Sequence, residues 1–121
     1  MTLLGVLVAG ALGAPARYLV ERAAHRVGRA FPFGTFVVNV SGSLALGVVA
    51  GLALAHGLSG TARTVLGTGF LGAYTTFSTY TYETVRQAEA GRARVAVTYL
   101  LGSVAAGGGA AAVGLALSGG L

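Results

Sequence analysis

The sequence contains no cysteine and very little charge, and each shortage excludes a class of protein. Without cysteine the chain forms no disulfide and offers no thiolate ligand to a metal. Only 9% of its 121 residues are charged, whereas a soluble domain usually carries roughly 25%. Because 55% of the residues are hydrophobic, charge cannot cover a water-facing globule, and lipid is the expected solvent.

Lysine is also absent, so all eight basic residues are arginines, and the net charge is +5. The arginines fall between apolar blocks and form no patch, which is typical of membrane topology and headgroup contact. We therefore expect a lipid bilayer as surroundings and no nucleic-acid partner. The sequence also has no nucleophile–base pair, no Walker-type loop and no His-Glu-x-x-His motif, so we expect no enzyme.

Four apolar windows are each long enough to cross a bilayer, which takes roughly 20 residues. The four windows are 3–20, 33–55, 62–82 and 95–117. The three connectors between them are 21–32, 56–60 and 83–94. Short connectors predict antiparallel neighbours. We predict an all-α membrane protein with a single domain, 1–121, of four transmembrane helices.

The arginines are unequally divided between the two faces of such a protein. The face with the first and third connectors carries Arg22, Arg26, Arg29, Arg86, Arg92 and Arg94, and the opposite face carries Arg63. By the positive-inside rule, the first and third connectors are cytoplasmic and both termini are outside.

A polar run interrupts the third window. Residues 75–84 read T-T-F-S-T-Y-T-Y-E-T, and hydrocarbon offers such side chains no hydrogen-bond partners. The preceding residues 69–76 combine glycines with β-branched threonines, which is poor helix material and predicts unwound backbone or a bend. Composition alone favours a bend without ion chemistry. The polar run itself indicates the lining of a path for something polar.

Small and polar residues recur on one face of the second window, at Asn39, Ser43, Gly47 and Gly51. A membrane asparagine either bonds a neighbouring helix, worth about 1 kcal/mol, or aims its amide into a pore. Both interpretations stay open. Gly47–Gly51 is also a GxxxG pattern, which can mark a helix interface and favours an oligomer.

The fourth window has a similar stripe, at Tyr99, Ser103, Gly107 and Ala111, whose first half alone is polar. Phe77 and Tyr80 in the third window are three residues apart and can share a side. Such a pair usually packs, but the positive ring edges can also face an anion weakly.

Arg17 lies within the first window, two residues after Pro15, which we expect to disrupt the helix. Arg17 can snorkel to the interface, and a topology anchor is the favoured interpretation over a pore charge. Glu83 closes the polar run, either as a pore-mouth residue or as a partner for Arg86.

Three segments resemble the small fluoride-channel family (Fluc, also called CrcB). Residues 10–18 resemble its first-helix signature, 32–43 its P-x-G-T-x-x-V-N-x-x-G-S motif, and 69–80 its G-F-x-G-x-x-T-T-F-S-T-F motif. Length, span count and motif order agree over the whole chain. Tyr80 replaces the usual second phenylalanine, and its hydroxyl could join the pore or shift the ring edge.

The resemblance implies a fluoride-selective channel for passive export of cytoplasmic fluoride, which lowers its toxicity, in the cell membrane of a prokaryote. It implies an antiparallel dimer with a broken third helix and two fluoride paths at the subunit interface. It also implies a structural sodium ion, not transported, on the backbone carbonyls of Gly72 and Thr75. The implied pore residues are Asn39, Ser43, Phe77, Ser78, Thr79, Tyr80, Glu83, Tyr99 and Ser103.

The partner subunit has two possible identities. Dual topology needs nearly equal numbers of arginines on the two faces, and the six-to-one bias does not fit it well. The partner is therefore open: either a second, antiparallel copy or a paralogous subunit of opposite topology. Gly107 and Ala111 stand where relatives often carry serine or threonine, which leaves open the residues that complete the polar track.

The main alternative is a small multidrug exporter, also four-helical and antiparallel. Proton-coupled export of cationic drugs calls for a carboxylate deep in a span. Here Glu21 ends the first window, Glu83 lies at a boundary and tryptophan is absent. A structural subunit without transport would not explain the threonine-rich run.

Overall fold

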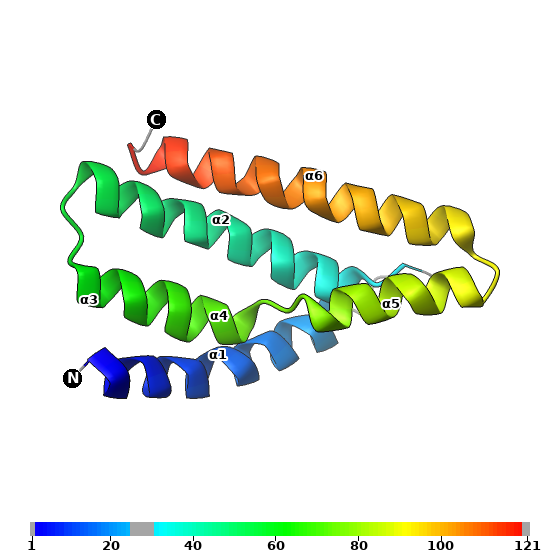
Figure 1. Ribbon diagram of the computed structural model, residues 1–121, viewed down its shortest axis with the longest axis horizontal. Coiled ribbons are helices and arrows are strands. Elements are labelled where there is room, and N and C mark those ends of the chain that lie inside the picture. Colours follow the sequence, from blue (N-terminus) through cyan, green and yellow to red (C-terminus); the bar gives the residue numbers. More distant parts are fainter. Residues whose placement is uncertain (1, 25–30, 120–121) are drawn as a thin grey trace.

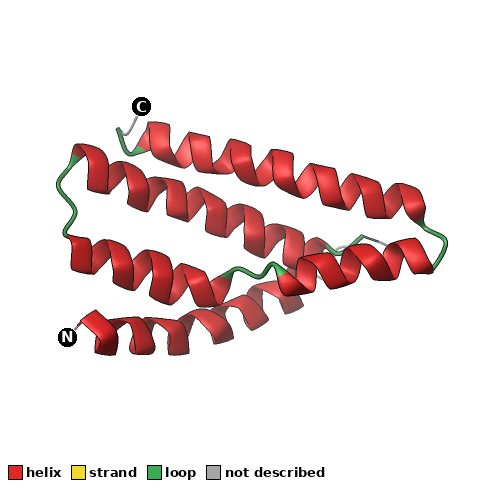
Figure 2. Ribbon diagram, in the orientation of Figure 1, coloured by secondary structure: helices red, strands yellow, loops and turns green. Residues whose placement is uncertain are grey.

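The chain forms a bundle of antiparallel helices (Figure 1). The computed structural model describes residues 2–24 and 31–119. Its elements are α1 (Thr2–Ala24), α2 (Phe33–Ala55), α3 (Gly60–Arg63), η1 (Thr64–Leu71), α4 (Gly72–Tyr74), α5 (Ser78–Glu89) and α6 (Ala93–Leu117). Within the described ranges every regular element is helical (Figure 2).

Three of the helices, α1, α2 and α6, are each long and apolar enough to cross a membrane. α2 coincides with the predicted window 33–55, and α1 and α6 extend their windows by a few residues. The expected disruption at Pro15 was wrong, since α1 continues through it. Proline removes one backbone hydrogen bond, and membrane helices tolerate that loss when neighbours compensate. Arg26 and Arg29 lie outside the described residues.

The third window is divided into two helical pieces. α3, η1 and α4 follow one another without a gap as far as Tyr74, and η1 is a π-helical stretch. The helix then stops, and α5 begins at Ser78 after a short loop (Figure 2). α5 continues to Glu89, so much of the predicted connector 83–94 is helical.

α2 is the central helix, packed against α6 on one side and against α1 and η1 on the other. A methyl group on Gly47 would overlap the carbonyl oxygen of Ala111. The GxxxG pattern of α2 therefore packs against α6 of the same chain. Similarly, a methyl group on Gly13 of α1 would overlap the carbonyl oxygen of Phe70 in η1. Both close approaches require glycine.

The two chain ends and the α2–α3 connection lie at one end of the bundle, and the α5–α6 connection lies at the other (Figure 1). Large apolar side chains such as Leu3, Leu7 and Leu101 point outward and are mostly exposed. Lipid would cover them. The interruption between α4 and α5 lies between the two ends of the bundle (Figure 1).

Candidate functional site

The interruption between α4 and α5 is capped by its own threonines. Thr75 has extended backbone, with φ −84° and ψ 162°. Its backbone N–H and its hydroxyl both donate to Leu71 O, at 2.9 Å each. On the other side of the interruption, the Thr76 hydroxyl oxygen accepts from the backbone N–H of Thr79 at 3.2 Å. The first bonds complete the end of α4, and the last caps the start of α5.

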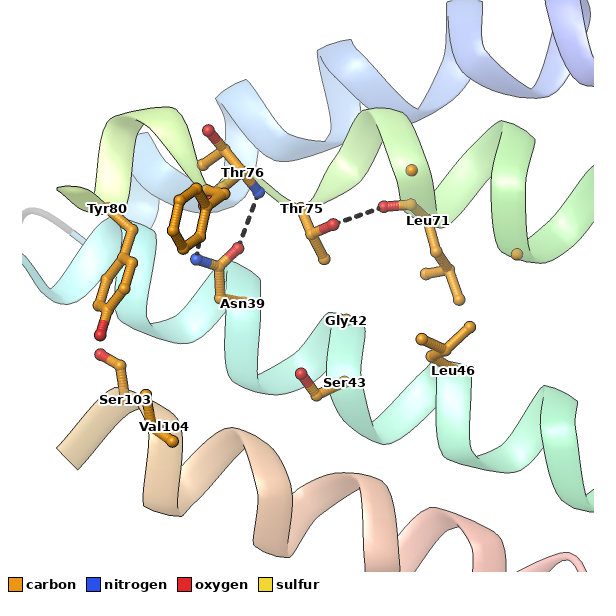
Figure 3. A pocket seen from close by; sticks show the side chains of 13 residues that line it. Asn39, Gly42, Ser43, Leu46, Leu71, Thr75, Thr76, Tyr80, Ser103 and Val104 are labelled. Atoms are coloured by element: carbon orange, nitrogen blue, oxygen red, sulfur yellow. Dashed lines mark hydrogen bonds between the residues drawn. The ribbon is translucent and has the colours of Figure 1, made fainter. Parts of the chain in front are cut away.

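Asn39 of α2 holds the middle of the interruption. Its Nδ2 donates to Thr76 O at 2.8 Å, and its Oδ1 accepts from Thr76 N at 2.9 Å (Figure 3). The Asn39 amide thus bonds both the backbone N–H and the backbone carbonyl of Thr76, and neither of these groups has a backbone partner in the described helices. Of the two interpretations left open by sequence, the structure places Asn39 on the broken segment. The second Nδ2 proton is not used by this pair.

Arg17 of α1 holds the interruption from another side. Its Nη1 donates to Thr75 O at 3.3 Å, in partly buried surroundings. The sequence favoured a topology anchor that reaches the interface. In the structure the guanidinium instead donates to the backbone of the interruption between α4 and α5.

The hydrogen bonds around the interruption leave two carbonyl oxygens without their helical donors. In a continuous helix, Gly72 O would accept from Thr76 N, and Thr75 O would accept from Thr79 N. Here Thr76 N donates to Asn39 and Thr79 N donates to the Thr76 hydroxyl. Gly72 and Thr75 are the residues for which the resemblance implies sodium. Carbonyl oxygens on unwound membrane backbone are typical ligands of a sodium ion.

A cavity of about 400 Å³ opens beside the interruption. It is lined by Asn39, Gly42, Ser43, Leu46, Gly67, Leu71, Gly72, Thr75, Thr76, Phe77, Tyr80, Ser103 and Val104. Ser43 and Ser103 face it from α2 and α6 (Figure 3). The Ser103 Oγ is buried and has no hydrogen-bond partner among the described residues. A buried hydroxyl of this kind can hydrogen-bond an occupant of the cavity.

The two aromatic candidates differ sharply in exposure. Their ring centroids are 6.0 Å apart, but Phe77 is 77% exposed whereas Tyr80 is only 7% exposed. The Tyr80 hydroxyl donates to Leu100 O in α6. The hydroxyl by which Tyr80 departs from the phenylalanine of the resembled motif is therefore bonded to a neighbouring helix.

Tyr99 and Glu83 lie outside this cavity. Tyr99 is fully buried, and its ring centroid lies 5.2 Å from that of Tyr80, with the two rings tilted by 57°. Its hydroxyl donates to Glu83 Oε1 at 3.0 Å. Glu83 lines a second cavity, of about 370 Å³, together with Arg86. Arg86 donates to the Tyr82 hydroxyl at 3.1 Å, and Glu83 accepts from Tyr99. Each residue of the suggested Glu83–Arg86 pair is therefore bonded to a tyrosine.

The remaining candidates occupy the first turn of α5. Neither Ser78 nor Thr79 lines the first cavity; the Ser78 hydroxyl is 3.4 Å from that of Thr76. Thr76 is the site residue that sequence reasoning missed. Its contribution is made through its backbone, and the only sequence signal for it is the paired threonine after the glycines.

Comparisons with known proteins agree over nearly the whole chain. The sequence family described as CrcB-like protein, Camphor Resistance (CrcB), matches residues 4–115. Fluoride-specific ion channel FluC 1 of Leifsonia xyli subsp. xyli is 46% identical over 120 residues, covering 98% of this chain and 88% of the relative. FluC 1 of Frankia casuarinae is 47% identical, covering 98% and 96%. FluC 2 of Cutibacterium acnes is 47% identical, covering 97% of each.

Proposed function

The chain belongs to the CrcB-like family, and from that premise we propose that it is a fluoride-selective channel for passive export of fluoride from the cytoplasm. It is a multi-pass protein of the cell membrane, by its apolar helices and its bacterial relatives. Fluoride that enters as HF ionises inside, and the membrane potential drives the anion out, at about 2.3 kcal/mol per charge per 100 mV.

The cavity at the interruption, with a few polar groups in a mostly apolar lining, is the observation that carries the proposal. Its lining offers an amide proton of Asn39 and the hydroxyls of Ser43 and Ser103, and among the described residues it includes no arginine or histidine. Fluoride is small and strongly hydrated, so it needs donors in place of water. A channel also requires binding weak enough for release, which neutral donors provide better than a full positive charge.

The proposal includes a second subunit in antiparallel orientation, and the exposure of Phe77 supports it. Its ring is 77% exposed beside the interruption, where a second copy or a paralogous chain would cover it. Phe77 would then form, with Tyr80, the aromatic surface that fluoride passes. Ser78, Thr79, Glu83 and Tyr99 would line the continuation of the same route.

A structural sodium ion would be held by Gly72 O and Thr75 O, the carbonyls whose helical donors are diverted. Two oxygens are few for a hard cation, and the same pair from a second subunit would give four. When bound, the ion would neutralise the partial negative charge of these carbonyls and join the two interrupted spans.

Efflux from liposomes tests the channel directly. Purified protein in vesicles loaded with potassium fluoride should release fluoride to an electrode once valinomycin is added, whereas chloride-loaded vesicles should release almost none. The Ser103→Ala variant should slow fluoride release, because the unpartnered hydroxyl is lost. Absent fluoride release, or equal chloride release, would refute the proposal.

Tag accessibility tests the partner. A tag after residue 121, probed from both sides of the membrane, should label on both sides if one chain forms dual-topology homodimers. Labelling from one side only would exclude the homodimer and indicate a paralogous subunit of opposite topology. The six-to-one arginine distribution between the faces motivates this experiment.

A further inference from the structure

Arg17 has a place in the structure that the proposed fluoride path does not use. Its guanidinium reaches from α1 to Thr75 O, across 58 residues of sequence. Arg17 is absent from the lining of the 400 Å³ cavity, whereas Thr75 is part of it. The positive charge therefore contacts the interruption from outside the cavity.

The oxygen that Arg17 contacts is one that attracts cations. The last carbonyls of a helix carry partial negative charge, and Thr75 O follows the last turn of α4. Its helical donor, Thr79 N, is diverted to the Thr76 hydroxyl. Arg17 supplies the missing donor together with a full positive charge.

We propose that Arg17 is a positioning residue that holds the Thr75 carbonyl and weakens the binding of sodium there. This inference rests on the sodium site of the proposed function. A carbonyl oxygen has two lone pairs and can accept from both cations. Two positive charges that share one oxygen nevertheless repel each other, and the membrane interior screens that repulsion poorly. Sodium affinity is thus set by the charge at position 17 as well as by the carbonyls.

Sodium binding can be measured without fluoride flux. Thermal unfolding of the purified full-length protein is followed by circular dichroism while sodium replaces N-methylglucamine, and the stabilisation gives a Kd for sodium. Arg17→Gln keeps an N–H donor but removes the charge, so its Kd should fall at least about tenfold. Arg17→Lys keeps the charge and should bind sodium as the wild type does.

Arg22→Gln is the matched control, because it also removes a guanidinium from α1. The Arg22 guanidinium donates to the Tyr18 hydroxyl and not to the interruption. The Kd of this variant should be that of the wild type. If Arg17→Gln does not fold, Arg17→Met provides the same neutral test. An unchanged Kd in the neutral variants would overturn the role of Arg17 and leave the sodium site standing. A wild-type protein that does not respond to sodium would overturn the site itself, and this inference with it.

Discussion

Replacing Asn39 by alanine tests whether the amide serves the interruption or only the ion. The change removes two hydrogen bonds, at 2.8 and 2.9 Å, to the backbone of Thr76. Hydrogen bonds in membrane proteins average about 0.6 kcal/mol, and those in proteins generally about 1 kcal/mol. The loss is therefore about 1–2 kcal/mol, a several-fold to 30-fold change in the folded-to-unfolded ratio.

Two variants separate the roles of Asn39. Asn39→Asp keeps an acceptor for Thr76 N but places a second oxygen against Thr76 O, so the interruption loses one bond and gains a repulsion. Its negative charge in the cavity would also repel fluoride. We expect N39A to be less stable and slower in fluoride efflux, and N39D to lose efflux almost completely.

Stability is read by far-UV circular dichroism during titration with sodium dodecyl sulfate, since the chain has no tryptophan for fluorescence. Ser43→Ala is the control: it lies one turn along the same face of α2 and lines the same cavity. S43A should slow efflux with unchanged stability. If N39A also unfolded like the wild type while efflux fell, Asn39 would not hold the interruption and our reasoning would be wrong.

Two further variants test the packing around the site. Tyr80→Phe loses only the bond to Leu100 O, so fluoride efflux over chloride should persist with about 1 kcal/mol less stability; an inactive Y80F channel would show that the hydroxyl serves the ion. Gly47→Ala forces a methyl against Ala111 O and should cost about 1–3 kcal/mol in the same titration. Gly108→Ala, whose new methyl has no atom within 4 Å, should unfold like the wild type; equal stability of G47A and G108A would contradict the α2–α6 contact.

The long helices could be predicted from sequence because apolar length is a local property. Window 33–55 and α2 coincide, and the other two apolar helices differ from their windows by a few residues. The extent of α5 could not be predicted this way. Its polar residues remain helical because tertiary bonds, from Tyr80 to Leu100 O and from Tyr99 to Glu83, attach it to α6.

The sequence predicted some of the residues that line the cavity, such as Asn39, Ser43 and Ser103, but not the contacts that they make. Asn39 and Thr76 are 37 residues apart, and Arg17 and Thr75 are 58 apart. Periodicity within one helix places a residue on a face, yet it carries no information about which distant backbone that face meets. Such contacts were needed to choose between the two interpretations of Asn39 and to assign the role of Arg17.

The threonine hydroxyls beside the interruption also have a different role from the one that their polarity suggests. The Thr75 hydroxyl donates its proton to Leu71 O, and the Thr76 hydroxyl accepts from Thr79 N, so both help to cap the two half-helices. An interruption at membrane depth persists only if its backbone is satisfied. Under the proposed function, most of the donors for fluoride would therefore come from the flanking helices, at Asn39 and Ser43 of α2 and Ser103 of α6. The polar run shapes the cavity, and its neighbours supply most of the chemistry within it.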